Sequence, residues 1–217
     1  MNIAPAPHNA PHTFNSVSLT ARDLCLSRGE TRLTQGFSLD LKGGDAVLLT
    51  GSNGAGKTTL LRALAGFVRP DTGTIKICGD ALNVTATDFI AWLGHVDGLK
   101  PTETVRQTLQ FWTETHGQAR SEIMPALKSV DMHRFIDRPT GQLSRGQQRR
   151  IGLARVILSA RPIWFLDEPA GPLDGAGREC LTAVVADHRA KGGMVIAATH
   201  QQLNWPEAQT IELGAAS

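Results

Sequence analysis

A glycine-rich segment that follows an apolar run constrains the fold of this chain more than any other feature. The apolar run, residues 46–50, suits a central strand, since parallel strands covered on both faces are apolar throughout. A helical pattern begins at Lys57 and continues to residue 67. The segment that joins them matches the phosphate-loop pattern in full, with the residues Gly51, Ser52, Asn53, Gly54, Ala55, Gly56, Lys57 and Thr58. Together they predict a phosphate-binding α/β domain.

The residue types of this loop suit it to hold the phosphates of ATP. Glycines let the backbone curl so that successive N–H groups point at phosphate oxygens, and the helix start adds its positive end. We expect Lys57 to contact the β- and γ-phosphates and to act in catalysis, and the Thr58 hydroxyl to ligate Mg²⁺. Thr59 is expected to bind ATP beside them. The alternative, an ordinary glycine-rich turn, needs neither the strand before it nor the helix after it.

The size and charge of the chain narrow its class. Its 217 residues fit one domain, with room for a small inserted subdomain. The 22 Lys and Arg balance 20 Asp and Glu, so nucleic acid is not an expected partner. Three cysteines form no disulfide framework or metal pattern, which favours a reducing compartment. The sequence has no apolar run of about 18 residues, so we expect no membrane span.

The beginning of the chain differs in composition from the rest. Residues 1–14 hold Pro5, Pro7 and Pro11 among small and polar residues, without the basic flank and apolar stretch of a signal peptide. We expect a flexible extension there, with His8 and His12 in solvent rather than on a metal. The folded domain is then expected to cover residues 15–215.

The remainder alternates strand and helix patterns, which predicts a doubly wound, mostly parallel sheet with an antiparallel β subdomain at its start. From about residue 101 to 142, apolar residues recur at helical spacing, so we expect an α-helical subdomain inserted into the α/β core. The strand patterns cover residues 16–20, 24–27, 37–41, 74–78, 90–94, 163–166 and 194–198, and the helix patterns cover residues 145–159 and 177–190.

Two acids end the apolar strand pattern at 163–166. Carboxylates at the carboxyl end of a parallel strand lie beside the phosphate loop in such sheets. We expect Asp167 to hold Mg²⁺ through water and Glu168 to act as the general base that polarises the attacking water. Taken alone the pattern is weak, because solvated strand ends are often acidic.

The segment Leu143–Gln147 makes the prediction more specific. Ser144 and Gln147 fit a capping box, which by itself means only a well-capped helix start. Such a start, which includes Gly146, is also an anion site. The segment lies 87 residues after Lys57, so we expect it on the helical subdomain, away from its own phosphate loop. It is therefore expected to cap nucleotide held by another protomer.

In these motifs the chain resembles the ABC transporter ATPases from about residue 17 to 213. The phosphate loop, the signature segment 143–147, the Asp167–Glu168 pair and His200 stand in the order and spacing of that family. The resemblance implies a head-to-tail homodimer with two sandwiched ATP molecules. It also implies that His200 contacts the γ-phosphate in catalysis and that Asp174 closes the loop that bridges protomers.

Three positions depart from the family pattern. Arg28 stands where an aromatic ring usually meets adenine, and its guanidinium can stack on a base. His95 takes the position of a metal-site glutamine, unless a gap in the alignment gives that position to Val96. Arg145 replaces a glycine of the signature and adds positive charge. Because none of the hydrolytic residues is missing, we expect an active ATPase.

Within the family, the chain is most similar to the ATP-binding subunits of haem exporters in bacterial cytochrome c maturation. The resemblance rests on residues 92–95, 98–100, 146–150 and 199–201, and on the missing adenine tyrosine. It implies integral membrane partners and a peripheral position on the cytoplasmic face of the bacterial inner membrane. The chain has no Cys-x-x-Cys-His haem-attachment pattern, so direct haem binding is not expected.

A docking surface for the membrane partner is expected around residues 95–100, next to a helix that carries Phe111 and Trp112. Asp97 and Lys100 are expected at the surface, where charge reversal leaves the fold intact. One alternative function is the ATPase subunit of another small-molecule ABC transporter. A more distant one is a soluble phosphotransferase, in which the signature segment and His200 would have no role.

Overall fold

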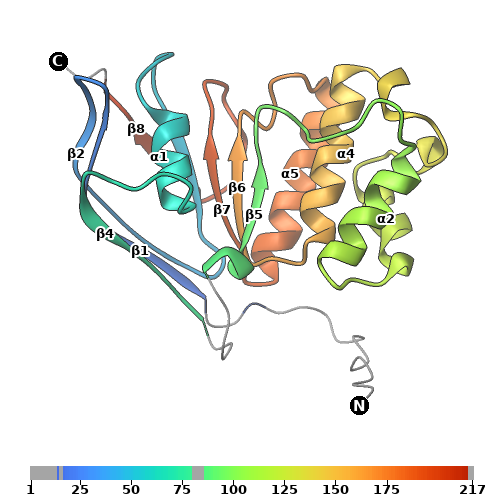
Figure 1. Cartoon of the computed structure of the whole chain (residues 1–217), viewed down its shortest axis with the longest axis horizontal. Helices are drawn as coiled ribbons and strands as arrows, with labels where there is room; N and C mark the ends of the chain where they lie inside the picture. The colour runs from blue at the N-terminus through green and yellow to red at the C-terminus, as the bar shows by residue number, and fades with distance from the viewer. Residues whose placement is uncertain (1–13, 15–16, 80–85, 215–217) are drawn as a thin grey trace.

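A five-stranded parallel sheet runs through the middle of the molecule in the order β5-β6-β7-β3-β8 (Figure 1). The computed structural model describes residue 14 and residues 17–79 and 86–214. The strands are β3 (Ala46–Thr50), β5 (Ile90–Leu93), β6 (Ile163–Asp167), β7 (Met194–Ala198) and β8 (Gln209–Glu212). Every residue of β6 and β7 is buried. The predicted parallel core is confirmed.

A second, antiparallel sheet has the order β2-β1-β4. Its strands are β1 (Ser18–Arg28), β2 (Thr31–Lys42) and β4 (Thr72–Cys78). The antiparallel strand structure predicted at residues 16–20 and 24–27 is confirmed from Ser18 onward, but the two segments form one long strand rather than two. Its pairing with β2 shifts register between Ala21 and Leu24, and Asp23 between them has a positive φ of 48°. This bulge interrupts the alternation from which the pattern was recognised.

The long helices lie on opposite sides of the parallel sheet (Figure 1). On one side, α1 (Lys57–Leu64) lies between the two sheets. On the other side lie α4 (Arg145–Leu158) and α5 (Gly175–Ala190). Helix α1 ends before the predicted residue 67, because Gly66 adopts the left-handed conformation (φ 76°) that terminates many helices.

Short helices fill residues 101–142, as predicted. They are α2 (Val105–Thr115), α3 (Ile123–Ser129) and the 3₁₀ helices η2 (Arg120–Glu122), η3 (His133–Phe135) and η4 (Thr140–Gln142), while η1 (Ala86–Phe89) precedes β5. Leu109 and Leu127 belong to the same buried cluster as Leu48 and Leu166 of the sheet. The helical segment thus shares a core with the sheet, and its limits as an inserted subdomain stay a prediction.

Alternate residues of each central strand face two separate cores. Val47 and Phe165 point toward α1 and the antiparallel sheet. Leu48 and Leu166 point toward the helices on the other side. Because both faces of the sheet are covered by packed side chains, only the ends of its strands are accessible to a ligand. At the carboxyl end lie the loops that follow β3, β5, β6 and β7, which is where parallel sheets place their ligand sites.

The opposite end of the sheet holds a buried aromatic stack. The ring of His188, 4% exposed, stacks on Trp164 with ring centroids 3.8 Å apart, and its Nε2 lies 3.1 Å from the carbonyl oxygen of Pro162. Phe14 packs on the same histidine and donates its backbone N–H to the carbonyl oxygen of Lys191. Phe14 thus contacts the folded part of the chain. The boundary expected after residue 14 stays a prediction, and residues 1–13 lie outside the described part.

None of the helices among the described residues combines the length and apolar character that a bilayer crossing requires.

The buried histidine predicts a pH-dependent stability. Burial lowers the pKa of His188 from 6.5 to about 4. Between these values the unfolded chain binds the proton first, so the folded state loses stability as the pH falls from about 6.5 towards 4, by about 3 kcal/mol in total. We expect His188→Phe, which keeps a ring against Trp164, to remove this part of the acid sensitivity. Urea unfolding of both proteins at pH 7.5 and pH 4.5 measures it. Equal losses in the two proteins would contradict the assignment.

Candidate active site

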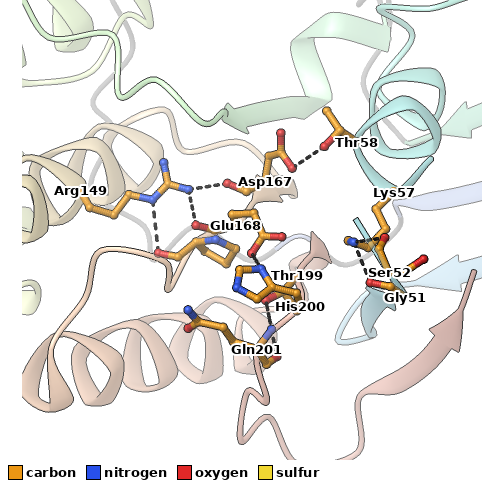
Figure 2. Close-up of polar contacts among 11 residues, drawn as sticks. Gly51, Ser52, Lys57, Thr58, Arg149, Asp167, Glu168, Thr199, His200 and Gln201 are labelled. Carbon is orange, nitrogen blue, oxygen red and sulfur yellow. Dashed lines mark hydrogen bonds and ion pairs between the residues drawn. The ribbon is translucent and has the colours of Figure 1, made fainter. Parts of the chain in front are cut away.

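The phosphate loop, residues 51–58, curls around the ammonium group of its own lysine. Gly51, Gly54 and Gly56 have positive φ angles of 133°, 86° and 91°. Lys57 is 7% exposed, and its Nζ donates to the carbonyl oxygens of Gly51 at 2.8 Å and Ser52 at 2.9 Å (Figure 2). The positive charge therefore lies among the carbonyl oxygens of the loop, and its contact with phosphate stays a prediction.

The position of the loop is set from both ends. A side chain at Gly51 would place its Cβ 2.4 Å from the carbonyl oxygen of Leu213, so only glycine fits against the segment after β8. At the other end, α1 begins at Lys57 without a side-chain cap. The N–H groups of its first turn are therefore available to an anion, and the positive end of the helix favours one.

An acid from β6 meets the first turn of α1. The Thr58 hydroxyl donates to Oδ1 of Asp167 at 2.9 Å, although 109 residues separate them (Figure 2). Asp167 is 4% exposed. A hydroxyl and a carboxylate are the hard oxygen ligands that Mg²⁺ prefers, and Mg²⁺ usually takes only one or two carboxylates, with phosphates and water completing its shell. These donors fit the predicted ion, and the expected position of Asp167 beside the phosphate loop is confirmed.

The ends of β6 and β7 bring Glu168 and His200 together. Oε2 of Glu168 lies 2.9 Å from Nδ1 of His200 (Figure 2). The Glu168 backbone N–H donates to the carbonyl oxygen of Ala198. The Thr199 hydroxyl accepts from the backbone N–H of Gln201, which holds the turn that carries the histidine. The Glu168 side chain is 24% exposed and that of His200 is 55% exposed. Both can therefore reach a ligand at the edge of the sheet.

A buried arginine with no role expected from the sequence supports this edge. Arg149 of α4 is 3% exposed. Its guanidinium donates to five acceptors, the carbonyl oxygens of Gly94, Asp167, Glu168 and Pro169 and Oδ1 of Asp97. One signal in the sequence was available: Arg149 stands three residues before Gly152 and four before Leu153, on the apolar side of its helix. A cation in such a position needs buried partners.

The signature segment forms the start of α4. The Ser144 hydroxyl accepts from the Gln147 backbone N–H at 3.2 Å, and Oε1 of Gln147 accepts from the Ser144 N–H at 2.9 Å, which confirms the capping box. A Cβ at Gly146 would lie 2.8 Å from the carbonyl oxygen of Pro172, so glycine lets α4 approach the loop after Glu168. Among the described residues, no hydrogen bond joins Ser144 or Gln147 to the phosphate loop.

Asp174 caps the next helix and is also tied to α4. Its Oδ1 accepts from the Gly177 backbone N–H at 2.8 Å and from the Arg150 guanidinium at 2.7 Å. These two contacts, the N–H of Gly177 first, hold the pKa of Asp174 below its ordinary value. The loop from Glu168 to Asp174 is thus attached to α4 at both ends.

Arg28 and His95 are both exposed at the rim of this region. Arg28 ends β1 in the hairpin with β2, and Leu33 of that hairpin lies against Gly56 of the phosphate loop. His95 follows β5, whose neighbour in the sheet is β6. Val96 is 79% exposed. The binding roles expected for Arg28 and for His95 or Val96 stay predictions.

The expectation that Asp97 is a freely exposed surface residue is wrong. Its side chain is 14% exposed and lies 2.8 Å from the guanidinium of Arg149. Charge reversal there would place two cations together beside the core. Lys100 does lie at the surface, with its side chain 73% exposed and paired with Glu103.

The parallel sheet and the phosphate loop with an acid beside its threonine define a phosphate-loop nucleotide hydrolase. Residues 34–171 match the ABC transporter family, and the chain belongs to that family.

Individual relatives agree with this assignment. The chain is 56% identical to the cytochrome c biogenesis ATP-binding export protein CcmA of Maricaulis maris, over 91% of this chain and 92% of that protein. It is 43% identical to the protein of the same name from Roseobacter denitrificans, over 91% of each. Among solved structures, a putative ABC transporter ATP-binding protein from Pyrococcus furiosus matches with a TM-score of 0.77 and 25% identity, over 90% of this chain and 97% of that one. The predicted family and fold are confirmed.

The geometry predicts different losses for two substitutions. Lys57→Ala should weaken ATP binding and abolish turnover, because the loop loses its buried cation. Glu168→Gln should keep ATP binding and lower turnover at least roughly 100-fold, the scale of losing a general base. Phosphate release and fluorescent-nucleotide titration measure the two quantities. Normal turnover by Glu168→Gln would show that another group activates the water.

Proposed function

We propose that this chain is the ATP-hydrolysing subunit of a membrane export complex for cytochrome c biogenesis, and that haem is the cargo of that complex. The observation that carries the proposal is the contact of Thr58 in the phosphate loop with Asp167, next to the Glu168–His200 pair, in a chain that is 56% identical to an export protein of that process. As an ABC ATPase the chain binds and hydrolyses ATP. The cargo is not expected to touch this subunit.

In this proposal each edge residue has a defined task. Lys57 contacts the β- and γ-phosphates, and the N–H groups of the loop and of α1 bind their oxygens. Thr58 and Asp167 would hold Mg²⁺, which neutralises charge on the phosphates when bound. Glu168 accepts a proton from the attacking water, and His200 contacts the γ-phosphate beside it. The close pairing of Glu168 with His200 supports a joint role at that phosphate.

Arg28 is the proposed contact for adenine. Its hairpin lies beside the phosphate loop through the approach of Leu33 to Gly56, and its side chain is exposed. A guanidinium plane can stack on the face of a base. His95 is proposed to contribute near the Mg²⁺ site, since β5 runs parallel to β6 and ends at the same edge.

The chain is further proposed to work as a homodimer with ATP between the subunits. The start of α4 is a capped helix end with an exposed Ser144, and a helix start of this kind can bind a phosphate group. Among the described residues, Ser144 makes no hydrogen bond to the phosphate loop of the same chain. A second protomer, arranged head to tail, would bring its ATP to Ser144, Gly146 and Gln147. Asp174 lies in the loop proposed to bridge the two protomers.

Dimer formation should therefore depend on ATP and on Ser144. We expect Glu168→Gln with ATP to form a dimer, because the γ-phosphate that both subunits hold is not removed. Adding Ser144→Arg should keep the protein monomeric. Thr104→Arg is the matched control, since Thr104 has the same kind of capping box on α2, with Gln107 as its partner. Multi-angle light scattering measures the mass. A monomer for Glu168→Gln at saturating ATP would contradict the sandwich arrangement.

The membrane partner is proposed to bind a docking patch made of Val96, Lys100 and Phe111. Val96 is 79% exposed and Phe111 is 56% exposed, while Nζ of Lys100 lies 5.9 Å from the centroid of the Phe111 ring. An exposed apolar ring beside a charge is typical of an interaction site, and the exposed Val96 lies four residues before Lys100 in the same segment. Docking there would hold the chain at the cytoplasmic face of the inner membrane as a peripheral subunit.

Complementation tests both the function and the docking patch. In a bacterium that lacks its own copy of this subunit, the wild-type chain should restore haem attachment to c-type cytochromes, seen as haem-stained bands. Glu168→Gln should not restore it. Phe111→Ser with Lys100→Glu should keep ATP turnover of the isolated subunit but lose both maturation and co-purification with membranes.

The matched control is Phe67→Ser, which removes a ring of similar exposure (54%) three residues after the end of α1. It should behave as wild type. Normal cytochrome c maturation in the bacterium that lacks this subunit, before any chain is added, would contradict the proposed process. Normal maturation and membrane co-purification with the docking-patch variant would show that the partner binds elsewhere.

A further inference from the structure

The buried guanidinium of Arg149 joins three parts of the molecule that are far apart in the sequence. It belongs to α4, whose first turn is the signature segment. It contacts Gly94 and Asp97 in the segment after β5. It also contacts the backbone of residues 167–169, around the proposed base. None of the tasks proposed above uses this side chain.

Only arginine can satisfy this set of acceptors. A guanidinium has five N–H donors in a planar fork, whereas a lysine ammonium has three on a single atom. The acceptors surround the fork from two segments, and Asp97 supplies the compensating charge at 2.8 Å. A buried cation without such partners would be strongly destabilising. The position of the guanidinium therefore depends on both segments being in place.

The backbone that Arg149 holds is strained at the proposed base. Glu168 has a φ of 49°, in the left-handed region that side chains other than glycine rarely adopt. Such conformations persist where the surroundings over-determine them, and they are frequent at functional sites. The Arg149 fork binds the carbonyl oxygens of Asp167, Glu168 and Pro169, so it fixes the peptide groups on both sides of this residue. The direction of the Glu168 carboxylate follows from that backbone.

Helix α4 contacts the same loop at a second point. Gly146, in the signature segment, approaches the carbonyl oxygen of Pro172 so closely that a Cβ would lie 2.8 Å from it. Gly152, on the other side of Arg149, lies against Leu93 and Asp97 in the same way. A shift of α4 along or across this contact would therefore displace Arg149 relative to the carbonyl groups that it holds.

We propose that Arg149 is a positioning residue that couples the signature segment of each protomer to the general base of the same protomer. This inference rests on the proposed ATP-sandwich dimer. When ATP bound to the partner subunit contacts Ser144 at the start of α4, it fixes the position of this helix. Arg149 then holds the strained backbone at Glu168 in the orientation that activates water. Each site thereby responds to nucleotide at the other.

Steady-state kinetics of Arg149→Gln and Arg149→Lys tests the coupling. We expect kcat to fall roughly 10- to 100-fold, the scale of a catalytic group misplaced by about 1 Å, while the KM for ATP stays within about threefold. We also expect the Hill coefficient for ATP to fall from about 2 to about 1. Lysine should not rescue turnover, since it keeps the charge but not the fork. A loss of folded protein would also lower kcat at an unchanged KM, but it would leave the Hill coefficient of the remaining folded dimer at about 2, so the Hill coefficient separates the two effects.

The matched control is Arg189→Gln. Arg189 also donates its guanidinium to two backbone carbonyls, those of Gly44 and Pro206, but it lies on α5. Its replacement should leave kcat and the Hill coefficient unchanged. If both Arg149 variants fail to fold, Asp97→Asn tests the coupling instead. This substitution removes only the charge that orients Arg149, so it should also lower kcat.

The outcomes separate this inference from the proposed dimer. Glu168→Gln with Arg149→Gln should still dimerise with ATP, because the sandwich contacts remain. If Glu168→Gln alone stays monomeric, the dimer proposal fails and the coupling fails with it, whatever kcat Arg149→Gln shows. If the dimer forms and soluble Arg149→Gln keeps a normal kcat and Hill coefficient, the coupling is wrong and the dimer stands.

Discussion

Burial of both faces of the parallel sheet is the constraint on which the rest of this structure depends. Val47 and Phe165 are covered by α1 and the antiparallel sheet, while Leu48 and Leu166 are covered by the helices opposite. A polar group on either face is costly unless it finds buried hydrogen-bond partners. The phosphate loop, the acids after β6 and the histidine after β7 therefore gather at one end, where strand ends leave backbone groups free to meet a ligand.

Helix α4 is the element that connects this end of the sheet to its surroundings. Its apolar residues Ile151 and Leu153 belong to the same buried cluster as Leu93 and Leu166 of the sheet. Within the same packed interface, Arg149 replaces apolar contact with hydrogen bonds to backbone carbonyls and an ion pair with Asp97. Arg150 ties the following loop to the same helix through Asp174. A helix that is bonded to a loop in this way cannot move without moving the loop, which is the physical basis for the coupling we propose.

Prediction from the sequence was most complete where the interactions are local. The phosphate loop and the capping box at Ser144 depend on residues within a few positions of each other, so their patterns are complete in the sequence. The β1 strand was divided in two because a bulge at Asp23 hides the alternation. Asp97 was expected in solvent because nothing near it in the sequence shows that it meets Arg149, 52 residues away.

The sequence by itself determined the family, the phosphate loop, the identity of the acids and the helical signature, because each is a matter of residue type and short spacing. Only the tertiary structure decided which of these groups meet. It placed Asp167 against Thr58, Glu168 against His200 and the guanidinium of Arg149 beneath the backbone at Glu168. The reason is physical, since strand order and helix packing bring together carbonyl oxygens and side chains from distant segments. Every residue has a backbone carbonyl, so residue types alone do not show which carbonyl accepts a hydrogen bond.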